Sequence, residues 1–177
     1  VNVSVEASYF QPMNTPEFAD GPTFMRTYNE AQQARSATAI TPRYSDEIIA
    51  ATESDINPYV YPNVDWYDMI FRSGNYNQRA NVNVSGGASR VTYYMSLQAN
   101  HDTGLLNAAD NSAFNPNINH WEYNFQNNIS YKLTNTTTVN LRMMAQIGSQ
   151  KGPDNKTTDI YKKVMYANPV SFPAYFP

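Results

Sequence analysis

The sequence predicts an all-β fold of about five antiparallel strands, joined by connections that are partly helical. Apolar and polar residues alternate along several stretches, as side chains alternate across a strand with a period of two. The connections between these stretches alternate between long and short. Charged residues make up only 15% of the chain, against about 25% in ordinary soluble domains. One face of the sheet is therefore expected in water and the other in an apolar medium, which is either a protein core or a lipid bilayer.

The predicted sheet is centred on a strand, a turn and a strand between Gln78 and Asn100. Each arm has an apolar wall and a polar wall, and the polar walls consist largely of amides and hydroxyls. Gly86 and Gly87 predict a turn over residues 86–89, because glycine accepts the positive φ angles of short hairpin loops. The five predicted strands lie near residues 1–10, 78–86, 89–100, 121–132 and 137–149.

Three long connections separate these strands, over residues 11–77, 101–120 and 150–177. The first is far too long for a hairpin loop, so it is expected to form a small subdomain or a large functional loop. Ser45 is the expected N-cap of a helix, because acidic residues follow it in the first turn. Helices are predicted over Phe24–Ala34, Ser45–Thr52, Trp66–Phe71 and Thr158–Tyr166.

Composition narrows the class of protein. The chain has 177 residues and a net charge of −3, so it is large enough for one domain and shows no strong attraction to nucleic acid. It contains no cysteine, so hydrogen bonding and burial must stabilise the fold. No run of about 18 apolar residues predicts a transmembrane helix, and no signal peptide precedes Val1. Because the alternation is already in register at Val1, we expect the chain to be a piece of a longer polypeptide.

The spacing of aromatic residues favours a bilayer over a protein core. Trp121 and Tyr131 lie on the apolar wall of one strand, and their separation spans on the order of 23 Å of membrane normal at a tilt of about 45°. Outer-membrane barrels have an apolar band about 25 Å tall between aromatic girdles, with short turns on one side and long loops on the other. The sequence therefore predicts a partial transmembrane antiparallel β-barrel with long, partly helical extracellular loops, and Tyr9, Trp121 and Tyr131 are its expected girdle residues.

Four motifs follow one another along the chain: TYNEA (27–31), YPNVDWYDMIF (61–71), NVNVSGGASRVTYYMSLQANHDTGLL (81–106) and YNFQNNISYKLTNTTTVNLRM (123–143). Together they resemble the SusC/RagA family of TonB-linked outer-membrane transporters of Bacteroidota. The resemblance covers most of the chain, at the start of that family's barrel just after its plug domain. The Ser-Gly-Gly hairpin and the Asp-Trp-Tyr stretch before it are its most specific parts.

The resemblance implies a large barrel of about 22 strands with a plugged lumen in the bacterial outer membrane. Such a protein imports oligosaccharides or peptides, draws energy through the TonB complex and is capped by a SusD-like surface lipoprotein. The implied partners are therefore the rest of the transporter chain with its plug, the lipoprotein, TonB and outer-membrane lipid. The plug, the TonB box and most of the strands of that family are not found in these residues, so we expect that this segment cannot transport anything alone.

The polar wall is where an imported substrate would touch this chain. Amides accept and donate hydrogen bonds to sugar hydroxyls, although the same side chains could merely solvate the lumen or contact the plug. Trp66 and Tyr67 could stack on a sugar ring or could anchor the first long connection. The candidate lumen residues are Glu122, Asn124, Gln126, Asn140, Arg142 and Gln146.

No motif in the chain indicates an enzyme, a metal or a cofactor. There is no phosphate-binding glycine loop, and no pairing of serine with carboxylates indicates hydrolysis. The two histidines are far apart in the sequence, whereas a metal site needs clustered ligands; Asp102 and Asp110 offer only a weak calcium alternative. Two rival functions stay open, which are a soluble extracellular carbohydrate-binding or adhesin β-domain and a passive porin-like barrel.

Overall fold

The structure is a computed structural model that describes residues 1–107 and 115–176. The chain divides into two compact units, each of which is described by itself. The sheet unit comprises Val1–Pro12 and Arg72–Asp154, and the helical unit comprises Met13–Phe71 and Asn155–Pro177. The predicted subdomain between the first two strands therefore forms its own unit together with the last segment of the chain.

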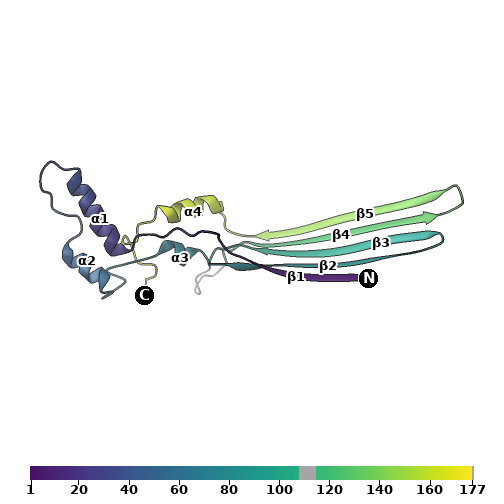
Figure 1. Ribbon diagram of the computed structural model, residues 1–177, viewed down its shortest axis with the longest axis horizontal. Coiled ribbons are helices and arrows are strands. Elements are labelled where there is room, and N and C mark those ends of the chain that lie inside the picture. The colour runs from purple at the N-terminus through teal and green to yellow at the C-terminus, as the bar shows by residue number, and fades with distance from the viewer. Residues whose placement is uncertain (108–114, 177) are drawn as a thin grey trace. The chain divides into compact units, whose positions relative to one another are not determined.

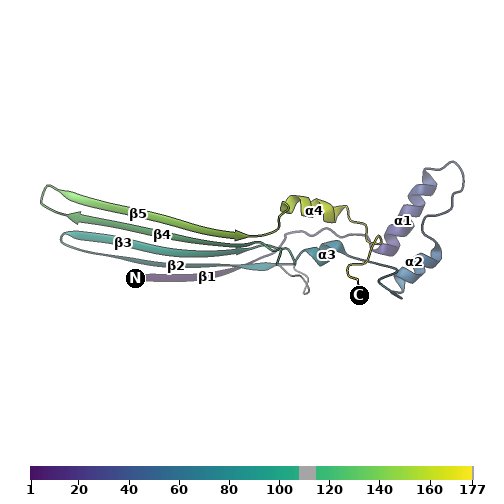
Figure 2. The same cartoon turned by 180° about the vertical axis from the view of Figure 1, so that it is seen from behind.

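The sheet unit is an open five-stranded antiparallel sheet whose strands follow one another in chain order, β1-β2-β3-β4-β5. Figures 1 and 2 show the strands side by side from opposite sides of the molecule. The predicted strands are confirmed, with ends shifted by at most three residues. The strands are β1 (Asn2–Phe10), β2 (Asn75–Ala88), β3 (Val91–Thr103), β4 (Asn119–Lys132) and β5 (Thr138–Lys151).

Strand register gathers the apolar residues of all five strands on one face. Val82 lies opposite Val3 on one side and Leu97 on the other. Leu97 in turn lies opposite Phe125, and Phe125 lies opposite Ala145. Directly opposed residues project to the same side of an antiparallel sheet, so these residues form one continuous row. The predicted separation of an apolar wall from a polar wall is thus confirmed across the whole sheet.

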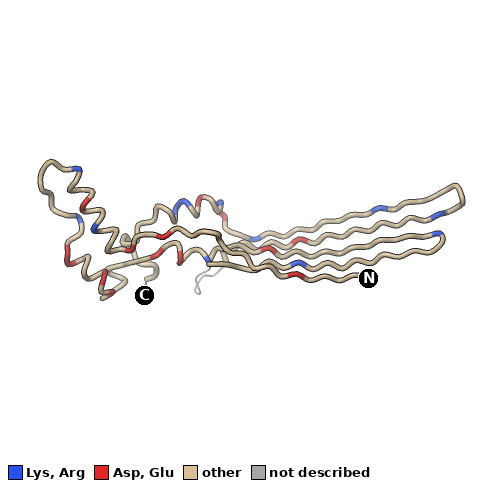
Figure 3. Tube along the Cα trace, in the orientation of Figure 1, with Lys and Arg blue, Asp and Glu red and all other residues tan. Residues whose placement is uncertain are grey.

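The apolar face is exposed. Lys, Arg, Asp and Glu are sparse along the strands (Figure 3). Asn127 is the polar exception on this otherwise apolar face. It lies between Met95 and Met143, and its Oδ1 has no hydrogen-bond partner among the described atoms. The exposed large side chains of this face are Val3, Val5, Tyr9, Tyr76, Val82, Tyr93, Met95, Leu97, Trp121, Tyr123, Tyr131, Val139, Leu141, Met143 and Ile147.

The predicted turn over residues 86–89 is wrong. β2 continues through Gly86 and Gly87 to Ala88, and the turn falls on residues 89–90. No glycine in the described residues has a positive φ, so the glycines do not serve the turn. Gly86 instead leaves room for the ring of Tyr93 on the neighbouring strand, because a Cβ at Gly86 would lie 2.6 Å from the tyrosine hydroxyl oxygen.

Asn117 holds the chain where it enters β4. Its side chain is buried, and its Oδ1 accepts hydrogen bonds from the backbone N–H groups of Leu106, at 3.1 Å, and Ile118, at 3.0 Å. Leu106 is itself buried, so its N–H has no access to water.

Replacing Asn117 by alanine is expected to destabilise this part of the sheet unit by about 1–3 kcal/mol, because it leaves a buried N–H without an acceptor. Asn117→Asp keeps an acceptor oxygen and is the matched control. Amide hydrogen exchange at Leu106 and Ile118 in the full-length protein measures the effect. Equal protection in the alanine and aspartate variants would mean that another acceptor serves these amides.

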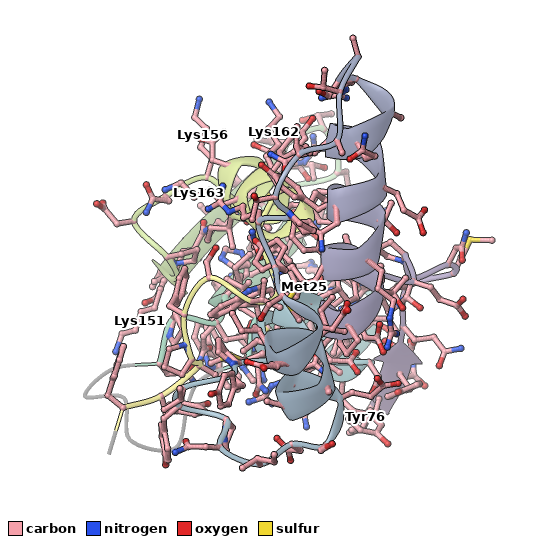
Figure 4. All side chains as sticks on the ribbon, turned by 90° about the vertical axis from the view of Figure 1, so that its left-hand side faces the viewer. Met25, Tyr76, Lys151, Lys156, Lys162 and Lys163 are labelled. Carbon is pink, nitrogen blue, oxygen red and sulfur yellow. The ribbon has the colours of Figure 1, made fainter. Side chains whose placement is uncertain are left out.

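The helical unit contains four helices among its described residues, α1 (Gly21–Ala34), α2 (Asp46–Glu53), α3 (Trp66–Ile70) and α4 (Thr157–Met165). All four were predicted, and Ser45 caps α2 as expected by accepting from the Ile48 N–H. α1 begins three residues earlier than predicted, because Pro22 occupies the first turn, where a missing N–H costs nothing. Met25 of α1, labelled in Figure 4, is a fully buried side chain of this unit, at 1% exposure.

No helix in the described part of the chain is long and apolar enough to cross a membrane.

Candidate functional site

Three of the predicted lumen residues form one hydrogen-bonded cluster on the polar face of the sheet, which we call the Glu122 cluster. Asn124 donates to Glu122 Oε1 at 2.7 Å, and Gln146 donates to Glu122 Oε2 at 2.7 Å. Asn100 of β3 donates to Oε1 at 3.3 Å and itself accepts from Gln98 at 3.1 Å. A single carboxylate is thus held by amides from three neighbouring strands, and its charge is fixed in position on the polar face.

The other predicted lumen residues lie toward the β2–β3 turn. Gln126 is opposite Ser96 and Met144. Asn140 and Arg142 of β5 line a shallow hollow of about 220 Å³ with residues of β3 and β4. Of the six candidates, three therefore form the Glu122 cluster, two line this hollow, and Gln126 belongs to neither.

Sequence reasoning missed Asn100 and a second chain of amides on β1, β2 and β3. Asn2 donates to Asn83 at 3.1 Å, Asn83 donates to Asn81 at 3.0 Å, and Asn81 donates to Ser96 at 3.3 Å. The alternation in the sequence assigns all of these residues to the polar wall. Only the register of the strands, however, determines which of them meet.

The predicted girdle residues lie at the two ends of the apolar face. Trp121 stacks on His101, with ring centroids 4.1 Å apart. Tyr9 packs on Tyr76, with ring centroids 5.0 Å apart. Tyr131 lies at the opposite end of β4, across from Val91. The apolar face between them holds aliphatic, methionine and further aromatic side chains, among them Tyr123 and Phe125. The assignment of Tyr9, Trp121 and Tyr131 to membrane girdles stays a prediction.

The helical unit contains a cavity of about 630 Å³, which we call the Trp66 pocket. Trp66 lines it and is also an anchor, because its Nε1 donates to the Asn168 carbonyl at 3.0 Å and its ring packs on Phe172 at 4.8 Å. Tyr67 lines the pocket too, and burial is the main cause that raises its pKa above the usual value. Both roles proposed for these aromatic residues, anchoring and ligand contact, are therefore geometrically open to them.

The pocket is built from three segments that are distant in the sequence. Besides the bond from Trp66 to Asn168, the Val64 N–H donates to the Pro169 carbonyl at 3.0 Å, and the Gly21 N–H donates to Asn63 Oδ1 at 2.7 Å. The lining residues lie in 18–20 with Phe24, in 63–67 and in 164–169. No local sequence signal joins these segments, and the sequence analysis did not predict the pocket.

Asp20 caps α1 at the rim of this pocket by accepting from the Thr23 N–H at 2.9 Å. The pKa of Asp20 lies below its usual value, first because of the hydrogen bonds from the side chain and backbone of Thr23, with a smaller attraction from Arg26.

Replacing Asp20 by alanine is expected to cost α1 about 1 kcal/mol at neutral pH. Because the folded-state pKa is the lower one, the contribution of the cap is fully present above the ordinary aspartate pKa of about 3.9 and is lost as the pH falls through the folded-state value. Protection of the Thr23 amide against hydrogen exchange, corrected for the intrinsic rate, measures both effects. Asp20→Asn keeps the cap without a titrating group, so a pH response in that variant would contradict the assignment.

Within residues 1–107 and 115–176 no three acidic or histidine side chains are grouped closely enough to hold a metal ion. Asp110, half of the weak calcium alternative, lies outside the described residues. No family model, curated protein or solved structure matches this chain.

Proposed function

We propose that this chain is a wall segment of a SusC-like, TonB-linked outer-membrane importer of oligosaccharides or peptides. The observation that carries the proposal is the exposed apolar face, which is continuous across five strands and bounded by aromatic residues at both ends. Its reverse face holds hydrogen-bonded amides and a fixed carboxylate. Such a sheet has one side suited to hydrocarbon and one suited to a water-filled lumen.

A sheet of this kind does not suit water on both sides. Soluble monomers rarely expose contiguous apolar patches larger than a few hundred Å², whereas Val3, Leu97 and Ile147 show that this face is exposed from the first strand to the last. The outer edges of β1 and β5 are also unpaired among the described strands. In a bilayer such edges require further strands, because every backbone N–H and C=O must find a partner there.

The assignment to this particular family rests on the sequence motifs that resemble it. The motif around Gly86 forms the hairpin of β2 and β3, and the motif that contains Trp66 forms part of the Trp66 pocket. Under this proposal the plug domain faces the Glu122 cluster, outer-membrane lipid covers the apolar face, and TonB and a SusD-like lipoprotein act on other parts of the full-length protein. In this proposal the chain forms part of the barrel wall and holds the polar side chains of the lumen face in place. It carries out no chemical reaction.

Fractionation of cells that express the full-length protein tests the proposal. We expect the protein in the outer-membrane fraction, released only by detergent, and we expect energised uptake of its substrate to stop when the plug or TonB is deleted. Recovery of a soluble protein without detergent would favour an extracellular binding or adhesin domain. Uptake that continues without TonB would favour a passive porin-like barrel.

A further inference from the structure

The Trp66 pocket carries an inference that goes beyond the importer assignment. Its volume of about 630 Å³ lies within the range of about 300–1,000 Å³ that is typical of ligand sites. All of its lining residues belong to the helical unit, so its shape does not depend on how the two units are arranged. Its chemistry can therefore be read from the residues of that unit alone.

The pocket is negatively charged. Asp20 and Asp65 line it, and none of the described lining residues is Lys, Arg or His. Both carboxylates use Oδ1 to cap a helix, Asp20 through the Thr23 N–H and Asp65 through the N–H groups of Tyr67 and Asp68. Neither takes part in an ion pair in the described part of the chain. Both carboxylates are exposed to solvent, and no basic side chain of the pocket wall pairs with them.

Nearby basic residues do not fill this role. Arg26 adds a weak attraction at Asp20, but its guanidinium lies 2.7 Å from Glu53. Lys162 and Lys163 of α4 precede the third segment of the pocket, yet both are exposed and neither lines it (Figure 4). A cation in the pocket would therefore have to come from a ligand.

Aromatic rings make up much of the remaining wall. Phe18 and Tyr67 lie with ring centroids 6.2 Å apart, and Phe24 and Trp66 also line the cavity. The face of an aromatic ring attracts an organic cation. The hydroxyl of Tyr67 is neutral at physiological pH, as in any ordinary tyrosine, and burial shifts its pKa further upward, so it adds no third charge.

We propose that the Trp66 pocket binds an organic cation on an apolar stem, which is the chemistry of a lysine or arginine side chain in a peptide. The carboxylates would pair with the charged head, and the aromatic rings would cover the stem. A neutral sugar could hydrogen-bond to Asp20 and Asp65 but would gain no attraction from their charges. A bare metal ion would find two carboxylates and no third acidic or histidine ligand among the described residues.

Binding of short peptides to the detergent-solubilised full-length protein tests this assignment. The probes are Ala-Ala-Lys-Ala-Ala with blocked ends and its arginine and norleucine counterparts, with maltotriose as a neutral sugar, and isothermal titration calorimetry is the measurement. We expect the two cationic peptides to bind about tenfold more tightly than the norleucine peptide, with a difference that shrinks at high salt. Equal affinity for lysine and norleucine, or no binding at all, would overturn the proposal.

Substitutions in the pocket wall test whether the peptides bind in the Trp66 pocket. Asp20→Asn together with Asp65→Asn removes both charges while keeping residues that cap helices well, and about a tenfold loss of lysine-peptide affinity is expected, with norleucine affinity unchanged. Asp46→Asn removes the same charge from α2, outside the pocket, and is the matched control. Phe18→Ala is a second pocket variant. It removes an exposed aromatic ring from the pocket wall and leaves both helix N-caps unchanged.

The outcomes are separable from those of the importer assignment. Unchanged lysine-peptide affinity in the double variant would overturn the pocket assignment, and so would binding of maltotriose that depends on the same two carboxylates. Fractionation and TonB-dependent uptake test the importer assignment by other measurements. Either proposal can therefore fail while the other survives.

Discussion

Replacing Leu97 by arginine in the full-length protein is expected to remove most of the folded protein from the outer membrane. Leu97 lies in β3, the central strand, on the apolar face between Val82 and Phe125. An arginine on the lipid-facing side of a barrel costs about 2–4 kcal/mol near the bilayer midplane. The amount of heat-modifiable, protease-resistant protein in the outer-membrane fraction measures the loss.

The neighbouring residue supplies the matched control. Gln98 lies on the opposite face of the same strand, between Asn81 and Asn124, so Gln98→Arg places the same charge in the expected lumen and should leave assembly nearly unchanged. In a soluble domain the result would differ, because Leu97 is already 54% exposed and an exposed substitution usually changes stability by less than about 0.5 kcal/mol. Normal assembly of the Leu97→Arg protein would contradict the lipid-facing assignment.

Replacing Trp66 by alanine is expected to destabilise the helical unit by about 2–4 kcal/mol. The lower end of the range known for aromatic-to-alanine changes applies because Trp66 is only partly buried. The change removes the ring contact with Phe172 and the hydrogen bond to the Asn168 carbonyl. Amide exchange at Val64, whose N–H bonds to Pro169, reports the loss directly.

Two further variants separate the parts of this anchor. Trp66→Phe keeps an aromatic ring against Phe172 and loses the hydrogen bond, so about 1 kcal/mol is expected. A double-mutant cycle with Phe172→Ala should show coupling, because residues in contact are not additive. If Trp66→Ala left Val64 protected, the residue would not be an anchor, and its part in the Trp66 pocket would be confined to contact with a ligand.

The strands could be predicted because their chemistry is local. A period of two in the sequence determines both the strand and the faces to which its side chains point, so Leu97 and Gln98 could be assigned to opposite faces without a structure. The turn could not be placed in the same way. Glycines near a hairpin usually indicate a turn with a positive φ. At Gly86, however, the absent side chain makes room for Tyr93. This role could be predicted only from the register of β2 and β3, which the sequence does not show.

The candidate sites show the same division between local and distant information. Glu122, Asn124 and Gln146 were predicted to lie on the polar wall, yet their convergence on one carboxylate depends on how three strands pair. The Trp66 pocket depends on contacts such as that between Trp66 and Asn168, which are 102 positions apart. No pattern within one segment of the sequence contains such a contact.

The strand order carries a consequence for how the molecule is made. Each of β2 to β5 is hydrogen-bonded to the strand that precedes it in the chain, so the sheet can assemble by adding one strand at a time in the order of the sequence. β1 and β5 each keep one edge unpaired among the described strands. During folding these two edges are the places most exposed to wrong strand pairing and aggregation.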